Sequence, residues 1–397
     1  MSEGDLVADL VVQRLRAWGV HRLFGYPGDG INGFMGALRR AGGDPQLVQA
    51  RHEENAALMA VGHAKYTGGV GVVTSTQGPG AVHLLNGLYD AKLDHVPVVA
   101  IVGQQQTSVL GAEYQQEIDL QGPFQDVAAQ YVQTVLTPEQ APMVLDRAFR
   151  TALATRSPCV VILPHDVQQE PVAESLPHEH GVVVTPEWRR PHVVPRAGDL
   201  REAANVLNAG ARVAILVGQG AREAQEQVRS VAERLGAGVT TSLLGKPWFD
   251  ESLPYSCGVM GHLGTTASAW LMEHCDTLFI VGSNDPWTEF YPPPGRARGV
   301  QVDLAGRHLG NRYPVEVGLT GDAADTLDAL LPLLDPPGDR SWRSDVEASV
   351  RQWHEVAQER AALPANPLNP ELVVRSLSAR LPADAQVSVD VGSVTYW

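Results

Sequence analysis

Residues 51–69, RHEENAALMAVGHAKYTGG, decide how the first half of this chain folds. The charged residues at its start directly follow the short apolar run QLVQA, and the remainder has the residue spacing of a helix. Arg51, His52, Glu53 and Glu54 therefore stand at the carboxyl end of a predicted strand, the edge of a parallel sheet where ligands bind. Acidic residues also favour the positive end of a helix dipole, so this stretch alone supports either a ligand site or simple helix stabilisation.

Apolar, β-branched runs alternate with helical stretches on both sides of this segment. In the first part of the chain the runs are HRLFGYP (21–27), QLVQAR (46–51), VGVVTST (70–76), VPVVAIVG (96–103) and PCVVILPHDV (158–167). Strands that alternate with helices predict an α/β fold, in which a parallel sheet is covered by helices on both faces. We assign residues 1–170, with an amphipathic opening helix over residues 3–18, to one doubly wound domain.

A stretch rich in proline and polar residues, residues 171–195, is predicted to be a linker. A second alternating series fills residues 196–335, with the runs RVAILVGQG (212–220), GVTTSLLG (238–245), DTLFIVGS (276–283), RGVQVDLAG (298–306) and VEVGLTG (315–321). Residues 336–362 are expected to connect onward through a helix around 343–362. Residues 363–397 begin a third helix–strand unit. Its strand in VSVDVGSV (387–394) lacks partners, so we expect this last domain either to be incomplete or to borrow its partners from elsewhere.

The composition is that of a globular protein with an acidic charge balance. Hydrophobic residues make up 44% of the chain and the formal net charge is −15, which argues against nucleic acid or an anionic membrane as a partner. No apolar run has the length of a membrane span and the N-terminus is acidic, so we expect a cytoplasmic protein. Cys159, Cys257 and Cys275 stand apart in apolar surroundings and are expected to be core thiols.

Three further motifs follow predicted strands. Glycines in GPG (78–80) permit a ligand to approach the backbone, or serve only to make a turn. GQG (218–220) resembles the start of a dinucleotide fingerprint, although Glu223 replaces its third glycine. SND (283–285) suits hydrogen bonds to a ribose or phosphate and equally an Asx turn. Motifs of zinc hydrolases, serine hydrolases and P-loop enzymes are not found.

In this order the motifs resemble the thiamine-diphosphate-dependent enzymes of the acetolactate synthase and pyruvate oxidase family. The matching stretches are FGYPGDGINGFMGAL, RHEENAALMAVGHAKYTGG, TQGPGAVHLLNGLYDAKLDHVPVVAIVG, YQQEIDLQGPF, LVGQGAREA and IVGSNDPWTEFYP. The resemblance runs along the whole chain and looks closest to the bacterial pyruvate oxidase and pyruvate:quinone dehydrogenase branch. It implies a pyrimidine-binding domain, a central domain and the start of a diphosphate-binding domain, with the family's magnesium motif beyond residue 397. No residue of this chain is therefore assigned to a metal.

The resemblance also implies roles for individual residues. Glu53 would hydrogen-bond a ring nitrogen of the thiamine pyrimidine and so drive the cofactor's own acid–base chemistry. Gln116 would orient the substrate, whereas Gln115 replaces a phenylalanine of related enzymes, which puts simple pyruvate specificity in question. Further residues match positions that shape the cofactor sites. For thiamine diphosphate these are Pro27, Gly28, Gly78, Pro79, Gly80, Asn86, Asp390 and Gly392; for FAD they are Gly218, Gly220, Ala221, Ser283, Asn284, Asp303 and Asp322.

The function that the resemblance implies is decarboxylation of a pyruvate-like 2-keto acid with flavin-linked oxidation, in a homodimer or homotetramer. Carboligation of the acetolactate synthase type is the catalytic alternative. A catalytically incomplete homologue that binds only a nucleotide or a partner subunit is the other, since magnesium and the diphosphate have no anchor among residues 1–397.

Overall fold

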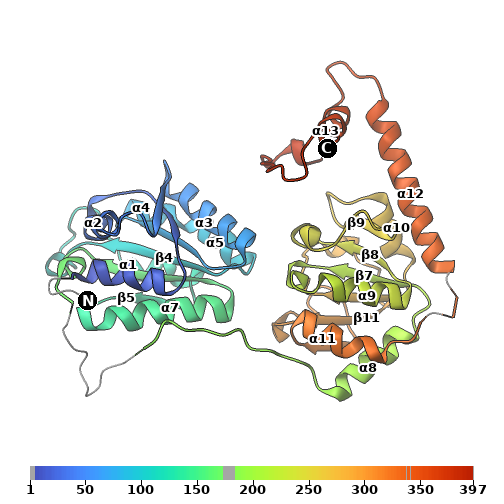
Figure 1. Ribbon diagram of the computed structural model, residues 1–397, viewed down its shortest axis with the longest axis horizontal. Coiled ribbons are helices and arrows are strands. Elements are labelled where there is room, and N and C mark those ends of the chain that lie inside the picture. The colour runs from blue at the N-terminus through green and yellow to red at the C-terminus, as the bar shows by residue number, and fades with distance from the viewer. Residues whose placement is uncertain (1–4, 173–183, 337, 340, 397) are drawn as a thin grey trace. The chain divides into compact units, whose positions relative to one another are not determined.

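The computed structural model describes residues 5–172, 184–336, 338–339 and 341–396. The chain divides into two compact units, Met1–Arg190 and Pro191–Trp397, and each has its own sheet (Figure 1). Residues 3–4 of the predicted opening helix and residues 173–183 of the predicted linker lie outside the described residues. The flanking residues 184–195 have no regular secondary structure.

The first unit contains a six-stranded sheet with the order β2-β1-β3-β4-β6-β5, and every pairing in it is parallel. Its strands are β1 (Arg22–Gly25), β2 (Gln46–Gln49), β3 (Gly71–Ser75), β4 (Val98–Gln104), β5 (Val132–Thr134) and β6 (Pro158–Pro164). Its helices are α1 (Val7–Ala17), α2 (Asn32–Arg40), α3 (Glu53–Thr67), α4 (Pro79–His83), α5 (Leu85–Leu93), α6 (Gln121–Val127) and α7 (Ala141–Thr155).

Helices cover both faces of this sheet, with α1 and α7 on one side and α3 and α5 on the other (Figure 1). The alternation of side chains along β4 explains the two layers. Val99 and Ile101 join the core beneath α1 and α7, whereas Val98 and Ala100 join the core beneath α3 and α5. A strand buried on both faces reads as one continuous apolar run, as the sequence of β4 does.

The second unit contains another six-stranded parallel sheet, with the order β12-β11-β10-β7-β8-β9. Its strands are β7 (Val213–Val217), β8 (Gly238–Thr241), β9 (Ser256–Val259), β10 (Thr277–Val281), β11 (Arg298–Asp303) and β12 (Val317–Thr320). Its helices are α8 (Ala197–Asn208), α9 (Gln225–Leu235), α10 (Thr266–His274), α11 (Ala323–Leu330), α12 (Ser341–Ala362) and α13 (Pro370–Ser378). The predicted α/β class with successive parallel sheets is therefore confirmed.

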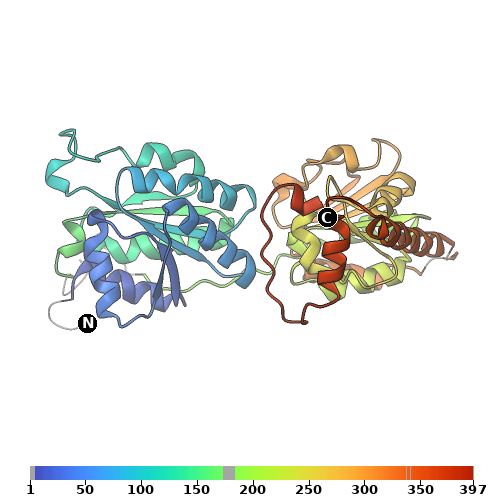
Figure 2. The same ribbon diagram turned by 90° about the horizontal axis from the view of Figure 1, so that it is seen from above.

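Two strands escaped the sequence analysis, and one predicted strand does not form. β5 and β9 are the outermost strands of their sheets, and they have three and four residues. The predicted strand over residues 387–391 is wrong: the stretch after α13 is a loop (Figure 2), with Val387, Val389 and Val391 at 61%, 56% and 92% exposure. An alternating valine pattern makes a strand only where a neighbour supplies hydrogen bonds, and no described strand lies beside this one.

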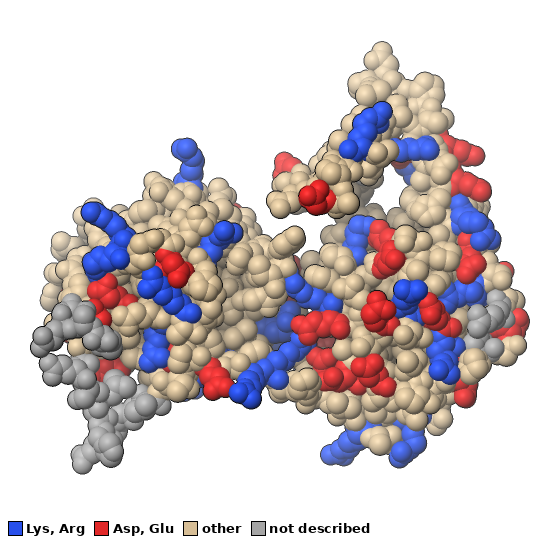
Figure 3. Space-filling view, in the orientation of Figure 1, with Lys and Arg blue, Asp and Glu red and all other residues tan. Residues whose placement is uncertain are grey.

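The distribution of charged side chains and the burial of the cysteines are those expected of a globular protein. Acidic and basic side chains are interspersed over the face of the second unit seen in Figure 3. Cys159, Cys257 and Cys275 are buried and unpaired, which confirms the prediction of core thiols. Among the described residues, no helix has the length and apolar character needed to cross a bilayer.

Candidate functional site

The candidate site of the first unit, called the crevice here, is the carboxyl edge of the sheet where the order of its strands reverses. The chain moves from β1 outward to β2 and then returns to the other side of β1 for β3, so the loops after β1 and β3 lie side by side at the carboxyl edge of the sheet. Ligands of parallel α/β sheets bind at such a reversal. Pro27 and Gly28 follow β1, and residues 76–80 follow β3. A Cβ atom on Gly28 would lie 2.5 Å from the Cβ of Thr76, so the two loops can approach closely only with glycine there.

Glu53 brings a buried carboxylate to this crevice. It is the first residue of α3 and is 7% exposed. The imidazole Nδ1 of His52 accepts a hydrogen bond of 3.2 Å from the amide of Glu54, which caps the helix and fixes where it begins. A Cβ atom on Gly80 would lie only 3.0 Å from Oε1 of Glu53. The same Cβ atom would lie 2.8 Å from the Thr76 methyl, so the glycine at the start of α4 lets the Thr76 and Glu53 side chains pack against the backbone there.

His83, at the end of α4, contacts the other oxygen of the same carboxylate. Its Nδ1 lies 3.0 Å from Oε2 of Glu53 and donates to it, since a carboxylate can only accept. The His83 ring also stacks on the ring of His52, with centroids 4.4 Å apart. The sequence analysis missed His83, although it stands in the quoted stretch GPGAVHLLNG, because nothing in the local pattern shows a contact with a residue 30 positions away.

Gln116 lies against the GPG turn. A Cβ atom on Gly78 would be 2.5 Å from the carbonyl oxygen of Gln116, and both residues have a positive φ, of 58° and 60°. The side chain of Gln77 ties this loop to the one after β1: its Nε2 lies 3.2 Å from Oε1 of Gln116 and 3.3 Å from Oδ1 of Asp29. The structure thus brings Gln116 and the GPG turn together, and it adds Gln77 and Asp29 to the predicted residues.

Asn86 was predicted to shape the pyrimidine pocket. Its amide donates a hydrogen bond to the carboxylate of Glu54, which joins α5 to α3 at the edge of the crevice. Glu54 therefore holds the helix bearing Asn86, while its neighbour Glu53 points into the crevice. Asp390 and Gly392, the predicted contacts at the far end of the chain, lie in the exposed loop after α13.

The predicted flavin residues gather at the carboxyl edge of the second sheet. β12, β11, β10 and β7 are neighbours in that order, so the residues that follow them stand side by side. The turn after β7 is, however, already satisfied by backbone hydrogen bonds. The amides of Gly218, Gly220 and Ala221 donate to the carbonyl oxygens of Val281, Gly282 and Gly218, respectively. These three amides are not available to a phosphate, and a Cβ on Gly218 would lie 2.2 Å from the Gly282 carbonyl oxygen, which explains the glycine by close backbone packing.

Polar side chains along the same edge are ordered by local contacts. Oδ1 of Asp303 accepts a hydrogen bond of 2.8 Å from the Ala305 amide, and burial raises the pKa of this carboxyl. The Asn284 side-chain oxygen accepts from Nε of Arg312 at 3.1 Å. Ser283 is buried at the end of β10. Asp322 caps α11, since its carboxylate accepts from the Ala324 amide at 3.0 Å.

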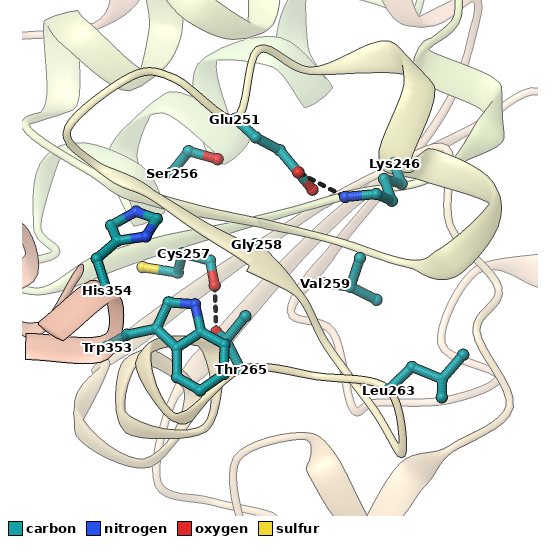
Figure 4. A pocket seen from close by; sticks show the side chains of 10 residues that line it. All are labelled: Lys246, Glu251, Ser256, Cys257, Gly258, Val259, Leu263, Thr265, Trp353 and His354. Carbon is teal, nitrogen blue, oxygen red and sulfur yellow. Dashed lines mark hydrogen bonds and ion pairs between the residues drawn. The ribbon is translucent and has the colours of Figure 1, made fainter. Parts of the chain in front are cut away.

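A separate cavity of about 240 Å³ is lined by β9, the loops on either side of it and α12 (Figure 4). Trp353 and His354 of α12 form one wall, and the ion pair between Lys246 and Glu251, at 2.5 Å, stands at another. None of the predicted site residues lines this cavity.

Comparison with known proteins shows to which family this chain belongs. Residues 6–123 match the model of the thiamine pyrophosphate enzyme N-terminal TPP-binding domain, and residues 200–330 match that of the central domain of the same enzymes. The acetolactate synthase isozyme 2 large subunit of Escherichia coli K12 is 33% identical over 401 residues, which covers 98% of this chain and 69% of that protein. This chain belongs to the thiamine-pyrophosphate-dependent enzymes.

Two other members of the thiamine-pyrophosphate family are similarly close. The thiamine-pyrophosphate-containing protein YdaP of Bacillus subtilis strain 168 is 35% identical over 387 residues, covering 98% of this chain and 66% of that protein. The pyruvate oxidase of Lactiplantibacillus plantarum is 30% identical over 391 residues, covering 98% of this chain and 64% of that protein. The chain thus spans about two thirds of the length of these family members.

Proposed function

We propose that the first unit binds the aminopyrimidine ring of thiamine diphosphate, with Glu53 hydrogen-bonded to a ring nitrogen. The observation that carries this proposal is the buried carboxylate of Glu53, with one oxygen beside the bare Gly80 and the other held by His83. No described residue donates a hydrogen bond to Oε1 of Glu53, so this oxygen is available to a ring nitrogen of the cofactor. In this assignment residues 1–170 form the pyrimidine domain and residues 196–335 the central domain.

Each group in the crevice has a distinct task under this proposal. The cofactor, when bound, supplies the carbanion chemistry that cleaves the bond next to a keto group. Glu53 shares a proton with the ring nitrogen, and His83 fixes the orientation of the Glu53 carboxylate. Gln116, anchored by Gln77, orients the substrate at the mouth of the crevice. Pro27, Gly28 and the GPG turn give the ring its walls.

The reaction proposed is decarboxylation of a pyruvate-like 2-keto acid with flavin-linked oxidation. One relative is named a pyruvate oxidase, which supports this choice. Carboligation is the second candidate, because another relative of equal coverage is named an acetolactate synthase. The polar Gln115 next to Gln116 favours a substrate with a polar group beyond the methyl of pyruvate. Magnesium would bind with the diphosphate, and none of the residues of this chain is assigned to it.

FAD is the flavin proposed for the second unit. The carboxyl ends of three adjacent strands, β10, β11 and β12, present Ser283, Asn284, Asp303 and Asp322 along one edge, and an acidic residue after a strand suits a ribose hydroxyl. Since the amides of the β7 turn are engaged, the phosphates would be held by guanidinium groups at this edge. Arg222 stacks over the Trp248 ring at 4.5 Å and Arg312 contacts Asn284.

A homodimer or homotetramer is proposed because apolar side chains are exposed around the crevice. Leu58 and Met59 of α3 and Val82 of α4 are between 39% and 42% exposed. Apolar groups clustered on adjacent helices favour a protein contact. A second subunit on these helices would also cover Glu53.

Two measurements test the proposed function. The first is product analysis after incubation of the protein with pyruvate, thiamine diphosphate, magnesium and an artificial electron acceptor. Formation of acetate supports oxidation, and formation of acetolactate supports carboligation. If wild-type protein forms neither product, the remaining candidate is a homologue that only binds a nucleotide or a partner subunit. The second is an absorption spectrum after desalting: a retained flavin spectrum supports FAD, and a colourless protein that takes up no added FAD rejects it.

A further inference from the structure

Three metal-ligating side chains meet at the mouth of the crevice. His52, Glu53 and His83 each offer one ligand atom within 4.8 Å of the other two. Two of them come from the start of α3 and one from the end of α4, so three ligands converge from two packed elements. We propose that these residues form a binding site for a borderline divalent transition metal, such as Zn²⁺ or Co²⁺.

The geometry between Glu53 and His83 already approaches that of two metal ligands. Ligand atoms placed tetrahedrally at about 2.0–2.1 Å from Zn²⁺ are about 3.3 Å from each other. Oε2 of Glu53 and Nδ1 of His83 are 3.0 Å apart. A cation that enters between them displaces one proton, from Nδ1 of His83 to solvent, and replaces the hydrogen bond by two coordinate bonds.

The third ligand, His52, needs a rearrangement. Its Nδ1 accepts from the Glu54 amide, so its Nε2 carries the proton in the present arrangement. If His52 coordinates the metal through Nε2, its proton moves to Nδ1, which can then no longer accept the hydrogen bond from the Glu54 amide. If it coordinates through Nδ1, the metal takes the place of the Glu54 amide. His52 must therefore give up its capping hydrogen bond, which makes it the weakest of the three ligands.

The type of ligand selects the metal. Two imidazoles and one carboxylate suit Zn²⁺, Co²⁺ or Ni²⁺, whereas Mg²⁺ prefers oxygen ligands alone. The site is thus chemically distinct from one that holds magnesium with a diphosphate. The side chains of His52 and His83 are 45% and 44% exposed, so a cation can enter from solvent and a water molecule can complete the coordination.

Metal binding would weaken the binding of the aminopyrimidine, a consequence that rests on the proposed function. The Glu53 carboxylate would be coordinated, and its orientation would be set by the metal instead of by His83. A transition metal on Oε2 would leave Oε1 in place but draw electron density from the carboxylate, so it would weaken cofactor binding at the crevice without blocking it sterically.

The test is a titration of untagged protein with Co²⁺, followed by visible ligand-field absorption and then by displacement with Zn²⁺. We expect one equivalent to bind, with at least about tenfold weaker affinity in H83A and in E53Q and a smaller loss in H52A. The matched control is H21A, because His21 forms an exposed pair with Asp44 at 2.9 Å and lies outside the cluster. Far-ultraviolet circular dichroism of each variant checks that it is folded, and H83Q replaces H83A if the latter does not fold.

The outcomes separate this inference from the proposed function. Absence of Co²⁺ binding, or affinity unchanged in both E53Q and the His83 variant, overturns the metal site and leaves the aminopyrimidine site untouched. Co²⁺ binding that depends on His83 and Glu53 but not on His21 supports it. If saturating thiamine changes neither the Co²⁺ affinity nor the ligand-field spectrum of the bound Co²⁺, the metal site stands and the placement of the pyrimidine at Glu53 fails.

Discussion

Oε2 of Glu53 lies 3.0 Å from Nδ1 of His83, and Oε1 of the same carboxylate faces the bare Cα of Gly80. One oxygen is thus committed to the protein and the other is left for a ligand. This division gives a buried carboxylate a fixed orientation, which a catalytic contact with a ring nitrogen requires.

Removal of His83 should weaken thiamine binding less than removal of the Glu53 charge. In H83A the carboxylate keeps its position at the start of α3 but loses the donor that orients it, so we expect a loss of up to about tenfold in affinity. H83N retains a donor near the same place and should recover part of the loss. Equal affinity in H83A and wild type, measured by ligand-observed NMR, would show that His83 does not orient Glu53.

The crossing of α3 and α5 should be sensitive to a single methyl group. A Cβ atom on Gly87 would lie 2.5 Å from the Cβ of Ala57 and 2.8 Å from its carbonyl carbon, so G87A should lower the free energy of unfolding by about 1–3 kcal/mol. Gly62, within α3, has nothing within 4 Å of the corresponding position, so G62A should raise it by up to about 1 kcal/mol. Urea unfolding of the two variants checks whether their free energies of unfolding change in opposite directions.

His63 should make the protein less stable in mild acid. Burial, followed by the nearby Arg22, lowers the pKa of His63 below its ordinary value of 6.5. The unfolded chain therefore takes up the proton first, and the stability present above pH 6.5 is lost as the pH falls from there towards the folded pKa. The midpoint of urea unfolding should drop between about pH 7.5 and pH 5.5 in wild type and drop less in H63Q. The same drop in both proteins would assign the effect to other groups.

The three thiols should be unreactive in the folded protein. Burial raises the pKa of Cys159, Cys257 and Cys275 to about 12 each. Thiolate is the reactive form, so a disulfide reagent at about pH 8 should find almost no reactive thiol in native protein. After denaturation the same reagent should react with three thiols per chain. Rapid reaction of one thiol in the native state would contradict its burial.

The sequence predicts the long, doubly buried strands and fails at the sheet edges. β4 and β6 are continuous apolar runs because helices cover both of their faces. β5 and β9 are short outer strands, and their residues carry no comparable signal. The alternating valines of residues 387–391 show the converse case, in which a strand pattern has no neighbour to pair with.

For the candidate site, the sequence identifies residues near turns and misses contacts between distant segments. Glu53 and the GPG turn could be singled out because each directly follows a predicted strand. His83 and the bridge from Gln77 to Asp29 became visible only when the fold brought separate loops together. The glycines of the β7 turn looked like a phosphate cradle, yet close backbone packing already explains them.

The most direct test of the central claim is saturation-transfer difference NMR of thiamine with the protein of residues 1–397. This method detects weak binding, and so it does not depend on a tight diphosphate site. We predict transfer strongest at the pyrimidine protons of thiamine, markedly reduced in E53Q and preserved in E54Q. Absence of transfer, or transfer to the pyrimidine protons that is unchanged in E53Q, would contradict the assignment of Glu53 as the partner of the aminopyrimidine ring.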